Sequence, residues 1–194
     1  MLSSVKTNYT PLIEIIAKPF LAVEPNVLTL VGLLFPAGFF YFMIHGAPHI
    51  AVLLLIGSTF DMIDGAVARL KGKTSVLGAV LDSACDRLSD GLLIAAFAYG
   101  GYISLELMLI TLIGAYLISY IRSRAELAVR GTESLAIGLM ERTERIIALL
   151  AITILCIAVQ FGFAELETIT YAFVFFSLLC WYTVGQRLWA IRSW

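Results

Sequence analysis

Residues 61–86 read DMIDGAVARLKGKTSVLGAVLDSACD and hold four aspartates, Asp61, Asp64, Asp82 and Asp86, within a strongly apolar chain. The apolar runs that contain them have the length of membrane-spanning helices. An ionised aspartate at the centre of a bilayer costs about 2.5–3.5 kcal/mol even on the most lenient insertion scale. A membrane protein that keeps four of them therefore needs them for a function.

The whole chain has the composition of an integral membrane protein. Of its 194 residues, 60% are hydrophobic and 14% are charged, and the mean hydropathy is +0.94. Soluble domains average about 45–50% apolar and about 25% charged residues. The net charge of −1 gives no sign of a nucleic-acid partner, and we expect none. Cys85, Cys156 and Cys180 lie in apolar runs without metal-ligand spacing, so we expect them to be buried and unpaired.

The spacing of the apolar runs and the basic residues predicts six transmembrane helices. The runs fall at about 27–44, 50–71, 75–99, 102–124, 138–160 and 168–190. The alternate breaks at 45–49, 100–106 and 161–167 contain no Lys or Arg. By the positive-inside rule, both termini are then cytoplasmic. We expect an all-α, multi-pass protein of the cell membrane whose active site opens to the cytoplasm.

A short amphipathic arm, residues 1–24, is expected to precede the membrane domain, residues 25–194. Within it, NYTPLIEIIAKPF (8–20) is typical of a helix lying along the membrane interface, with Thr10 as its cap and Pro11 at its first position. Its apolar stripe would consist of Ile13, Ile16 and Phe20. An unstructured arm remains the alternative.

The four aspartates are expected at matching depths on two antiparallel helices, because only residues 72–74 separate these helices. At 1.5 Å per residue, the aspartates lie roughly 10–19 Å from that turn. Helical spacing also puts them on two faces rich in small residues. One face carries Asp61, Asp64, Gly65 and Ala68, and the other carries Ser75, Gly78, Asp82 and Asp86. The two acidic faces point toward one another or toward a shared cavity.

The local charge balance favours bound divalent cations. Together with Asp90, the aspartates amount to five negative charges, which face only Arg69 and Arg87. Two like charges about 4 Å apart add roughly 4 kcal/mol at an effective dielectric constant near 20. Protons could remove this excess, but carboxylate ligands without His or Cys suit Mg²⁺, Mn²⁺ or Ca²⁺. The structural alternative is that the aspartates only pair with arginines to hold helices together.

The pattern Asp61-x2-Asp64-Gly65-x2-Ala68-Arg69-x8-Gly78-x3-Asp82-x3-Asp86 resembles the signature of the CDP-alcohol phosphotransferase family at every fixed position. The six spans and the preceding arm are also similar to that family. The resemblance implies transfer of a substituted phosphate from a CDP-linked lipid to a hydroxyl group of an alcohol, with release of CMP. It further implies two Mg²⁺ or Mn²⁺ ions and a homodimer.

Residue roles follow from the same resemblance. It implies that Asp61, Asp64 and Asp82 hold one metal ion, that Asp61, Asp82 and Asp86 hold or border a second, and that Asp86 is the general base. Residues expected to line the cytidine and diphosphate site are Gly65, Arg69, Ser75, Gly78 and, with less support, Asn26 and Thr29. For the last two, the alternative is a helix cap with Asn26 as the N-cap residue.

The acceptor is expected to contact arginines of the fourth and fifth spans. SYIRSRAE (119–126) and ERTER (141–145) contribute Arg122, Arg124, Arg142 and Arg145. Arginines at a helix start oppose the helix dipole, and a bound phosphate would remove that objection. These motifs resemble the inositol-phosphate branch of the family, which implies inositol 1-phosphate as acceptor. Glycerol 3-phosphate or another alcohol remains open, as does an acyl or isoprenoid lipid donor. Asp90 would orient Arg87 or contact acceptor hydroxyls.

Two other classes of function compete with the transferase hypothesis. A cation transporter could use the aspartates as its ion site, but such acids commonly lie at the membrane midplane between repeats. Here they lie nearer the cytoplasmic side, and the sequence has no internal repeat. A helical membrane scaffold gives no reason for the acidic faces.

Overall fold

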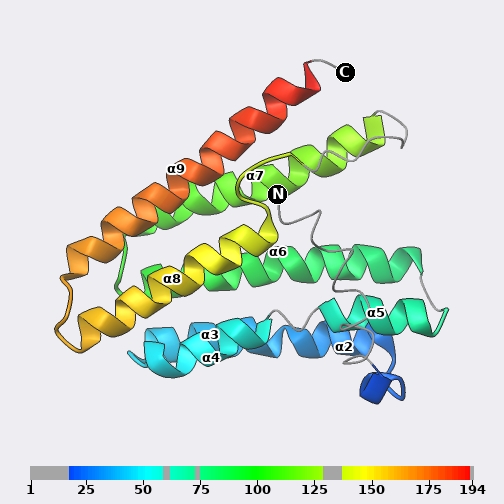
Figure 1. Ribbon diagram of the computed structural model, residues 1–194, viewed down its shortest axis with the longest axis horizontal. Helices are drawn as coiled ribbons and strands as arrows, with labels where there is room; N and C mark the ends of the chain where they lie inside the picture. The colour runs from blue at the N-terminus through cyan, green and yellow to red at the C-terminus, as the bar shows by residue number, and fades with distance from the viewer. Residues whose placement is uncertain (1–17, 59–61, 73–74, 129–136, 193–194) are drawn as a thin grey trace.

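The computed structural model describes residues 18–58, 62–72, 75–128 and 137–192, and these residues form helices and turns with no β-strand among them (Figure 1). The elements are η2 (Lys18–Phe20), α2 (Pro25–Gly32), α3 (Leu34–Ile44), α4 (Pro48–Gly57), α5 (Met62–Leu70), α6 (Val76–Tyr99), α7 (Leu105–Ala128), α8 (Arg142–Gln160) and α9 (Leu166–Ile191). The expected all-α architecture is therefore confirmed for the described residues.

The first expected span is divided at one residue. Leu33 ends α2 and begins α3. Pro36, which has no N–H to donate to Gly32 four residues earlier, explains the interruption. The second expected span, 50–71, corresponds to α4 and α5, whose bounds bracket residues 58–61; residues 59–61 lie outside the described part of the chain.

Among the described residues, four helical stretches are long and apolar enough to cross a membrane. They are α2 with α3 (Pro25–Ile44), α7, α8 and α9. The stretch α4 is apolar but has only 10 residues. The long helix α6 contains Asp82, Asp86, Arg87 and Asp90, which lower its apolar character. The protein is thus a membrane protein with several helices. That it has six spans, and on which side of the membrane its termini lie, remain predictions.

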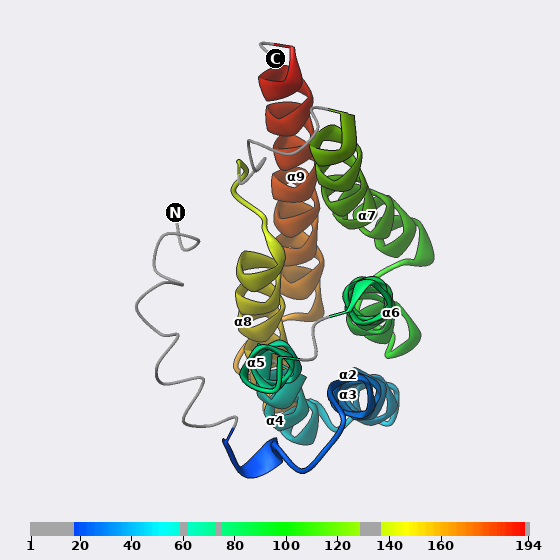
Figure 2. The same ribbon diagram turned by 90° about the vertical axis from the view of Figure 1, so that its right-hand side faces the viewer.

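The direction of the chain alternates along the molecule. The connections from α3 to α4, from α6 to α7 and from α8 to α9 gather at the left end in Figure 1, and α5, α7 and α9 end at the right. In the turned view, α2, α3 and α6 lie on one side of α4 and α5, below the inclined helices α7, α8 and α9 (Figure 2). The helix α2 packs against both α5 and α6, and α7 packs against both α6 and α9.

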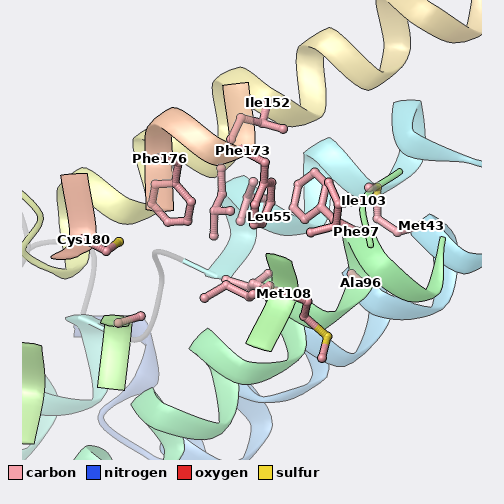
Figure 3. Close-up of a cluster of buried hydrophobic side chains, with 14 of the residues drawn as sticks. Met43, Leu55, Ala96, Phe97, Ile103, Met108, Ile152, Phe173, Phe176 and Cys180 are labelled. Atoms are coloured by element: carbon pink, nitrogen blue, oxygen red, sulfur yellow. The ribbon is translucent and has the colours of Figure 1, made fainter. Parts of the chain in front are cut away.

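The main hydrophobic core has an aromatic centre and extends as far as Ile118 of α7 and Met140, just before α8. It combines residues from α3, α4, α6, α7, α8 and α9, and includes Phe39, Leu55, Phe97 and Phe173, which are fully buried. The aromatic rings of Phe97 and Phe173 lie 5.2 Å apart, at the centre of the cluster drawn in Figure 3. Near α5 the described residues form only a small second cluster around Ala66 and Val67. The acidic end of the molecule is therefore built with little apolar bulk.

Most of the N-terminal arm lies outside the described residues. Of the segment 8–20, only Lys18–Phe20 is described, and it forms a short 3₁₀ turn. Just before α2, the backbone carbonyl of Val23 accepts a hydrogen bond of 3.0 Å from the Nζ of Lys71. This bond ties the start of the helical domain to the end of α5. The amphipathic helix and the domain boundary at residues 24 and 25 remain predictions.

Candidate active site

A cavity of about 770 Å³ opens at the end of the bundle away from the aromatic core. Its lining comes from α5, from the middle of α6 (82–90), from the second half of α7 (118–126), from Glu141 and the start of α8, and from Arg187 of α9. Its described carboxylates are Asp64, Asp82, Asp86, Asp90, Glu126 and Glu141, and its described basic residues are Arg69, Arg87, Arg122, Arg142, Arg145 and Arg187. The two acidic helix faces thus meet a shared cavity, with α2 packed against both α5 and α6.

Asp64 contributes the α5 carboxylate and is held from two sides. The backbone N–H of Gly65 donates a hydrogen bond of 2.5 Å to its Oδ1, and the hydroxyl of Thr29 on α2 donates to its Oδ2. Thr29 is buried and also lies 3.2 Å from the carbonyl oxygen of Pro25. The structure therefore joins Thr29, which the sequence suggested as a nucleotide contact, to a predicted metal ligand.

Asp82 and Asp86 lie one turn apart on α6 and both face the cavity. The Oδ1 of Asp86 is 2.8 Å from the Nη1 of Arg142, at the start of α8. Its Oδ2 is 3.8 Å from the Nη1 of Arg87, which also donates to the carbonyl oxygen of Ser83 at 2.8 Å. The predicted base and a predicted acceptor-binding arginine are therefore in direct contact.

The carboxylates of the cavity suit a hard divalent cation. Asp64, Asp82 and Asp86 offer only oxygen ligands from two helices, the chemistry that Mg²⁺ and Mn²⁺ prefer. In the part of the chain that the structure describes, no three His, Cys, Asp or Glu side chains lie close enough to form a complete site by themselves. Asp61, the fourth predicted ligand, lies outside the described residues. The donor set fits a metal, and the assignment of the individual ligands remains a prediction.

Asp90 and Arg145 form a buried ion pair between α6 and α8. Their side chains are 6% and 3% exposed, and the Nη2 of Arg145 lies 2.5 Å from the Oδ2 of Asp90. Arg145 also donates to the carbonyl oxygen of Met140 at 3.1 Å. The expectation that Asp90 orients Arg87 is wrong, because Asp90 pairs instead with Arg145, whose long side chain reaches it from the start of α8.

The other two predicted acceptor arginines differ in position. Arg122 lines the cavity and bonds to Glu126 one turn further along α7, with 2.9 Å between Nε and Oε1. Arg124 is exposed and is not among the residues lining the cavity. The structure therefore brings Arg122, Arg142 and Arg145 together and leaves Arg124 outside.

The predicted nucleotide residues fall into two groups. Gly65 and Arg69 line the cavity. Asn26, Ser75 and Gly78 meet beside it, where α2 and α6 begin: Ser75 caps α6 by accepting a bond of 3.0 Å from the N–H of Gly78. A Cβ atom on Gly78 would lie 3.2 Å from the Oδ1 of Asn26 and 3.1 Å from the Oγ of Ser75.

The alternative of Asn26 as a helix cap is wrong. Glu24 occupies the N-cap position of α2, and Asn26 lies within the first turn because Pro25 already takes the first helical position.

Arg187 and Glu141 belong to the cavity but were not selected from the sequence. Arg187 is 2% exposed, and its Nε and Nη1 donate to the carbonyl oxygens of Ile137 and Ile118 at 2.8 and 2.5 Å. Its Nη2 lies 3.8 Å from the Oε1 of Glu141. In the sequence Arg187 counted only as a basic residue of the cytoplasmic side. The sequence did contain one sign that Arg187 is buried in the protein, because it lies within the last apolar run, five residues before Arg192.

A match to a family model shows to which protein family this chain belongs. Residues 22–189 match the model described as CDP-alcohol phosphatidyltransferase. The chain belongs to the CDP-alcohol phosphatidyltransferase family. The resemblance seen in the aspartate pattern is thereby confirmed. The protein is an enzyme, a phosphotransferase, which sets aside the transporter and scaffold hypotheses.

Several curated relatives in the CDP-alcohol phosphatidyltransferase family are inositol phosphate synthases. The chain is 38% identical to archaetidylinositol phosphate synthase of Pyrococcus horikoshii over 196 aligned positions, which cover 100% of this chain and 97% of that protein. It is 38% identical to archaetidylinositol phosphate synthase of Aeropyrum pernix over 170 positions, which cover 85% of this chain and 81% of the relative.

Solved structures of a phosphatidylinositol phosphate synthase have the same fold as this CDP-alcohol phosphatidyltransferase family member. The Mycobacterium tuberculosis enzyme with CDP-DAG bound superposes with a TM-score of 0.75, at 28% identity, and the alignment covers 92% of each chain. The same enzyme in complex with manganese and citrate gives a TM-score of 0.76 at 26% identity, covering 93% of this chain and 89% of that one.

Proposed function

We propose that this enzyme transfers a lipid phosphate from a CDP-linked lipid to a hydroxyl group of inositol 1-phosphate and releases CMP. The main support for this proposal is the ion pair between Asp86 and Arg142 inside the acidic cavity, with 2.8 Å between the Oδ1 of Asp86 and the Nη1 of Arg142. It brings a carboxylate that can accept a proton next to a guanidinium group that can bind a phosphate monoester. An acceptor that carries both a hydroxyl and a phosphate group uses both residues.

The chemistry is a displacement at the phosphorus atom that bears the lipid. The acceptor hydroxyl oxygen forms a new bond to this phosphorus, and the bond from phosphorus to the bridging oxygen of CMP breaks. Asp86 takes the proton of the hydroxyl, for which it must lie within hydrogen-bond reach of the acceptor. Asp61, Asp64, Asp82 and Asp86 would hold one or two Mg²⁺ or Mn²⁺ ions, which would supply positive charge to neutralise the diphosphate.

The donor is proposed to bind between α5 and the start of α6. Gly65 and Arg69 line the cavity there, while Asn26, Ser75 and Gly78 lie close together where α2 and α6 begin, one turn before the cavity-lining Asp82. The small residues allow a diphosphate to approach the backbone closely. The M. tuberculosis relative with CDP-DAG bound supports a CDP-lipid donor, and the archaetidylinositol phosphate synthases support an isoprenoid lipid. We place the enzyme in the cell membrane, with the cavity open to the cytoplasm, and infer a homodimer from the resemblance alone.

The acceptor is tested by CMP release from the purified enzyme in lipid nanodiscs. CDP-archaeol and CDP-diacylglycerol are each supplied with Mg²⁺ or Mn²⁺ and with one acceptor: inositol 1-phosphate, glycerol 3-phosphate, inositol or serine. Inositol 1-phosphate should give the fastest release with either donor. Faster CMP release with glycerol 3-phosphate would show that inositol 1-phosphate is not the acceptor, although the reaction class would still hold. CMP release that is fastest with inositol or serine would exclude a phosphate-binding role for Arg142.

Replacing Arg142 tests the same site from the protein side. Arg142→Ala should raise the KM for inositol 1-phosphate about 10- to 100-fold, because the loss of a charge-assisted contact costs roughly 1.5–3 kcal/mol, and should change the KM for the CDP-lipid far less. Arg124→Ala is the matched control, because Arg124 is exposed and does not line the cavity. Equal rises in both Michaelis constants for Arg142→Ala would contradict the assignment.

A further inference from the structure

The segment Ile137–Met140, which leads into α8, is fastened to α9 by three side chains on one face of that helix. Thr183, Gln186 and Arg187 follow the spacing i, i+3 and i+4. The Oγ1 of Thr183 accepts a bond of 3.1 Å from the N–H of Met140. The Oε1 of Gln186 accepts one of 3.3 Å from the N–H of Leu139, and the Nε of Arg187 donates one of 2.8 Å to the carbonyl oxygen of Ile137. We call these three residues the α9 clamp.

The α9 clamp supplies partners for backbone groups that no regular helix satisfies. A buried backbone N–H or C=O group without a partner is costly, so its partner fixes where the backbone lies. Met140 is 5% exposed, and its N–H bonds to Thr183 while its carbonyl oxygen accepts from Arg145. Two residues after Met140, α8 begins with Arg142. The position of Arg142 is therefore set through this short segment.

Gly138 allows the segment to approach α9 closely. Its φ angle is +137°, a backbone conformation that residues with a side chain rarely adopt. A Cβ atom at this position would lie 2.5 Å from the Cγ2 of Thr183 and 3.5 Å from the Nε of Arg187. A larger residue would push the segment away from the clamp. The glycine and the clamp thus form a single fitted contact.

We infer that the α9 clamp is a positioning device for the acceptor site: Thr183 and Gln186 set the place of Arg142 against Asp86 without touching the acceptor. This inference rests on the proposed role of Arg142 as the acceptor-phosphate residue. Arg187 extends the device, since its Nη2 lies 3.8 Å from Glu141, the residue before Arg142. The predicted donor residues lie on or beside α2, α5 and α6, so we expect loss of the clamp to affect acceptor binding far more than donor binding.

The inference is tested with Thr183→Val, which keeps the shape of the side chain and removes the hydrogen-bond acceptor. The unpaired N–H of Met140 will shift the segment and displace Arg142. The KM for inositol 1-phosphate should rise about tenfold, which corresponds to about 1.4 kcal/mol, while the KM for the CDP-lipid and kcat remain within about twofold. Gln186→Leu, at a half-buried site, should raise the acceptor KM by about threefold and keeps the test decisive if Thr183→Val does not fold.

Two variants control for a merely structural effect. Thr183→Ser keeps the hydroxyl oxygen and should retain the wild-type KM for the acceptor. Thr153→Val removes a buried hydroxyl on α8 that bonds only to its own helix, at the carbonyl oxygen of Leu149, so it should change neither Michaelis constant. Thr183→Ser also removes the Cγ2 atom that a side chain at position 138 would strike. It should therefore partly restore the acceptor KM of Gly138→Ala.

Hydrogen exchange of the peptide that contains residues 137–141, followed by mass spectrometry, gives a readout besides activity. Thr183→Val should speed exchange in this peptide, and Thr153→Val should not. Unchanged exchange in Thr183→Val would overturn the inference, as would faster exchange with an unchanged acceptor KM. If Arg142→Ala still raised the acceptor KM in either case, the proposed function would stand. Absence of acceptor-dependent CMP release by the unmodified enzyme would overturn both.

Discussion

Asp86 combines, at one residue, the contacts that the proposed reaction requires. It faces the cavity beside Asp82, lies 2.8 Å from Arg142 and lies 3.8 Å from Arg87. Its side chain is 20% exposed, so a small polar substrate can reach it. Asp86 thus lies beside Arg142, the predicted ligand of the acceptor phosphate, and among the predicted metal ligands. A carboxylate in this position is well suited to accept the proton of the acceptor hydroxyl group.

Asp86→Asn should therefore lower kcat by about 10²–10⁴-fold, the usual contribution of a general base. The amide keeps the shape and a hydrogen-bonding oxygen, so binding of the CDP-lipid should change much less. Initial rates of CMP release give kcat, and titration with a CDP-lipid gives its affinity. An Asn variant that turns over at the wild-type rate would exclude Asp86 as the base.

Thr29 has a different role at the residue scale, since its hydroxyl donates to the Oδ2 of Asp64. Partners of metal ligands typically contribute 10- to 100-fold in metal affinity. Thr29→Val should therefore weaken Mn²⁺ binding by about that factor, as measured by isothermal titration. Thr111→Val is the matched control, because the buried Thr111 hydroxyl bonds only to the carbonyl oxygen of Leu107 on its own helix. Equal affinities in the two variants would argue against the role of Thr29.

The sequence predicted the acidic residues of the site better than their partners. The spacing of Asp64, Asp82 and Asp86 follows from helix periodicity, which is local. The bond from Thr29 to Asp64 joins residues 35 positions apart and depends on how α2 packs on α5. Likewise, Arg142 and Arg145 look alike in ERTER, and only the three-dimensional structure shows that Arg145 is the one buried against Asp90.

At the scale of elements, the site depends on how α6 and α8 face one another. Two ion pairs link them one turn apart: Asp86 with Arg142, and Asp90 with Arg145. The first pair is partly exposed to the cavity, and the second is buried. The buried pair ties the start of α8 to α6, and the α9 clamp holds the segment just before α8, so both contribute to placing Arg142 opposite Asp86.

Breaking the buried pair should destabilise the protein more than replacing it. Arg145→Met alone leaves the carboxylate of Asp90 buried without its cation, which typically costs about 3–5 kcal/mol. The double variant Asp90→Leu with Arg145→Met removes both charges and should lose much less stability. Thermal unfolding in detergent gives the comparison. A double variant less stable than Arg145→Met would show that the pair itself supplies net stability.

Element boundaries show why periodicity alone was insufficient. The expected runs agree closely with α6, which spans Val76–Tyr99, and with α9, which spans Leu166–Ile191. The break at Leu33 inside the first run was not expected, although Pro36 was visible in the sequence. Proline is tolerated in the first turn of a helix, and Pro36 is the third residue of α3. Because the apolar run continues unbroken through Leu33, the run itself gave no sign that a new helix starts at Leu34.

At the scale of the whole molecule, the positive-inside pattern and the alternating chain direction agree. The connection from α8 to α9, residues 161–167, contains no Lys or Arg, and α9 runs from there to the opposite end of the bundle (Figure 1), where its Arg187 lines the cavity. If the basic side is cytoplasmic, the cavity opens toward the nucleotide-containing compartment.

Single cysteines test this orientation in intact cells. Phe163→Cys, at a side chain that is 85% exposed between α8 and α9, should react with a membrane-impermeant maleimide added from outside. Arg192→Cys, at the exposed end of α9, should react only after the cells are permeabilised. The three native cysteines are buried and should give little background. Labelling of Arg192→Cys alone in intact cells would reverse the predicted topology.

The separation of the aromatic core from the acidic cavity has a consequence for adaptation. The buried aromatic rings gather around Phe97 and Phe173, whereas the predicted reacting groups line the cavity. Distant, independent sites contribute additively to stability. Heat tolerance can therefore be raised or lowered by substitutions among the aromatic residues while substrate preference evolves separately at the other end. One scaffold of this kind can serve organisms with very different growth temperatures without redesign of its chemistry.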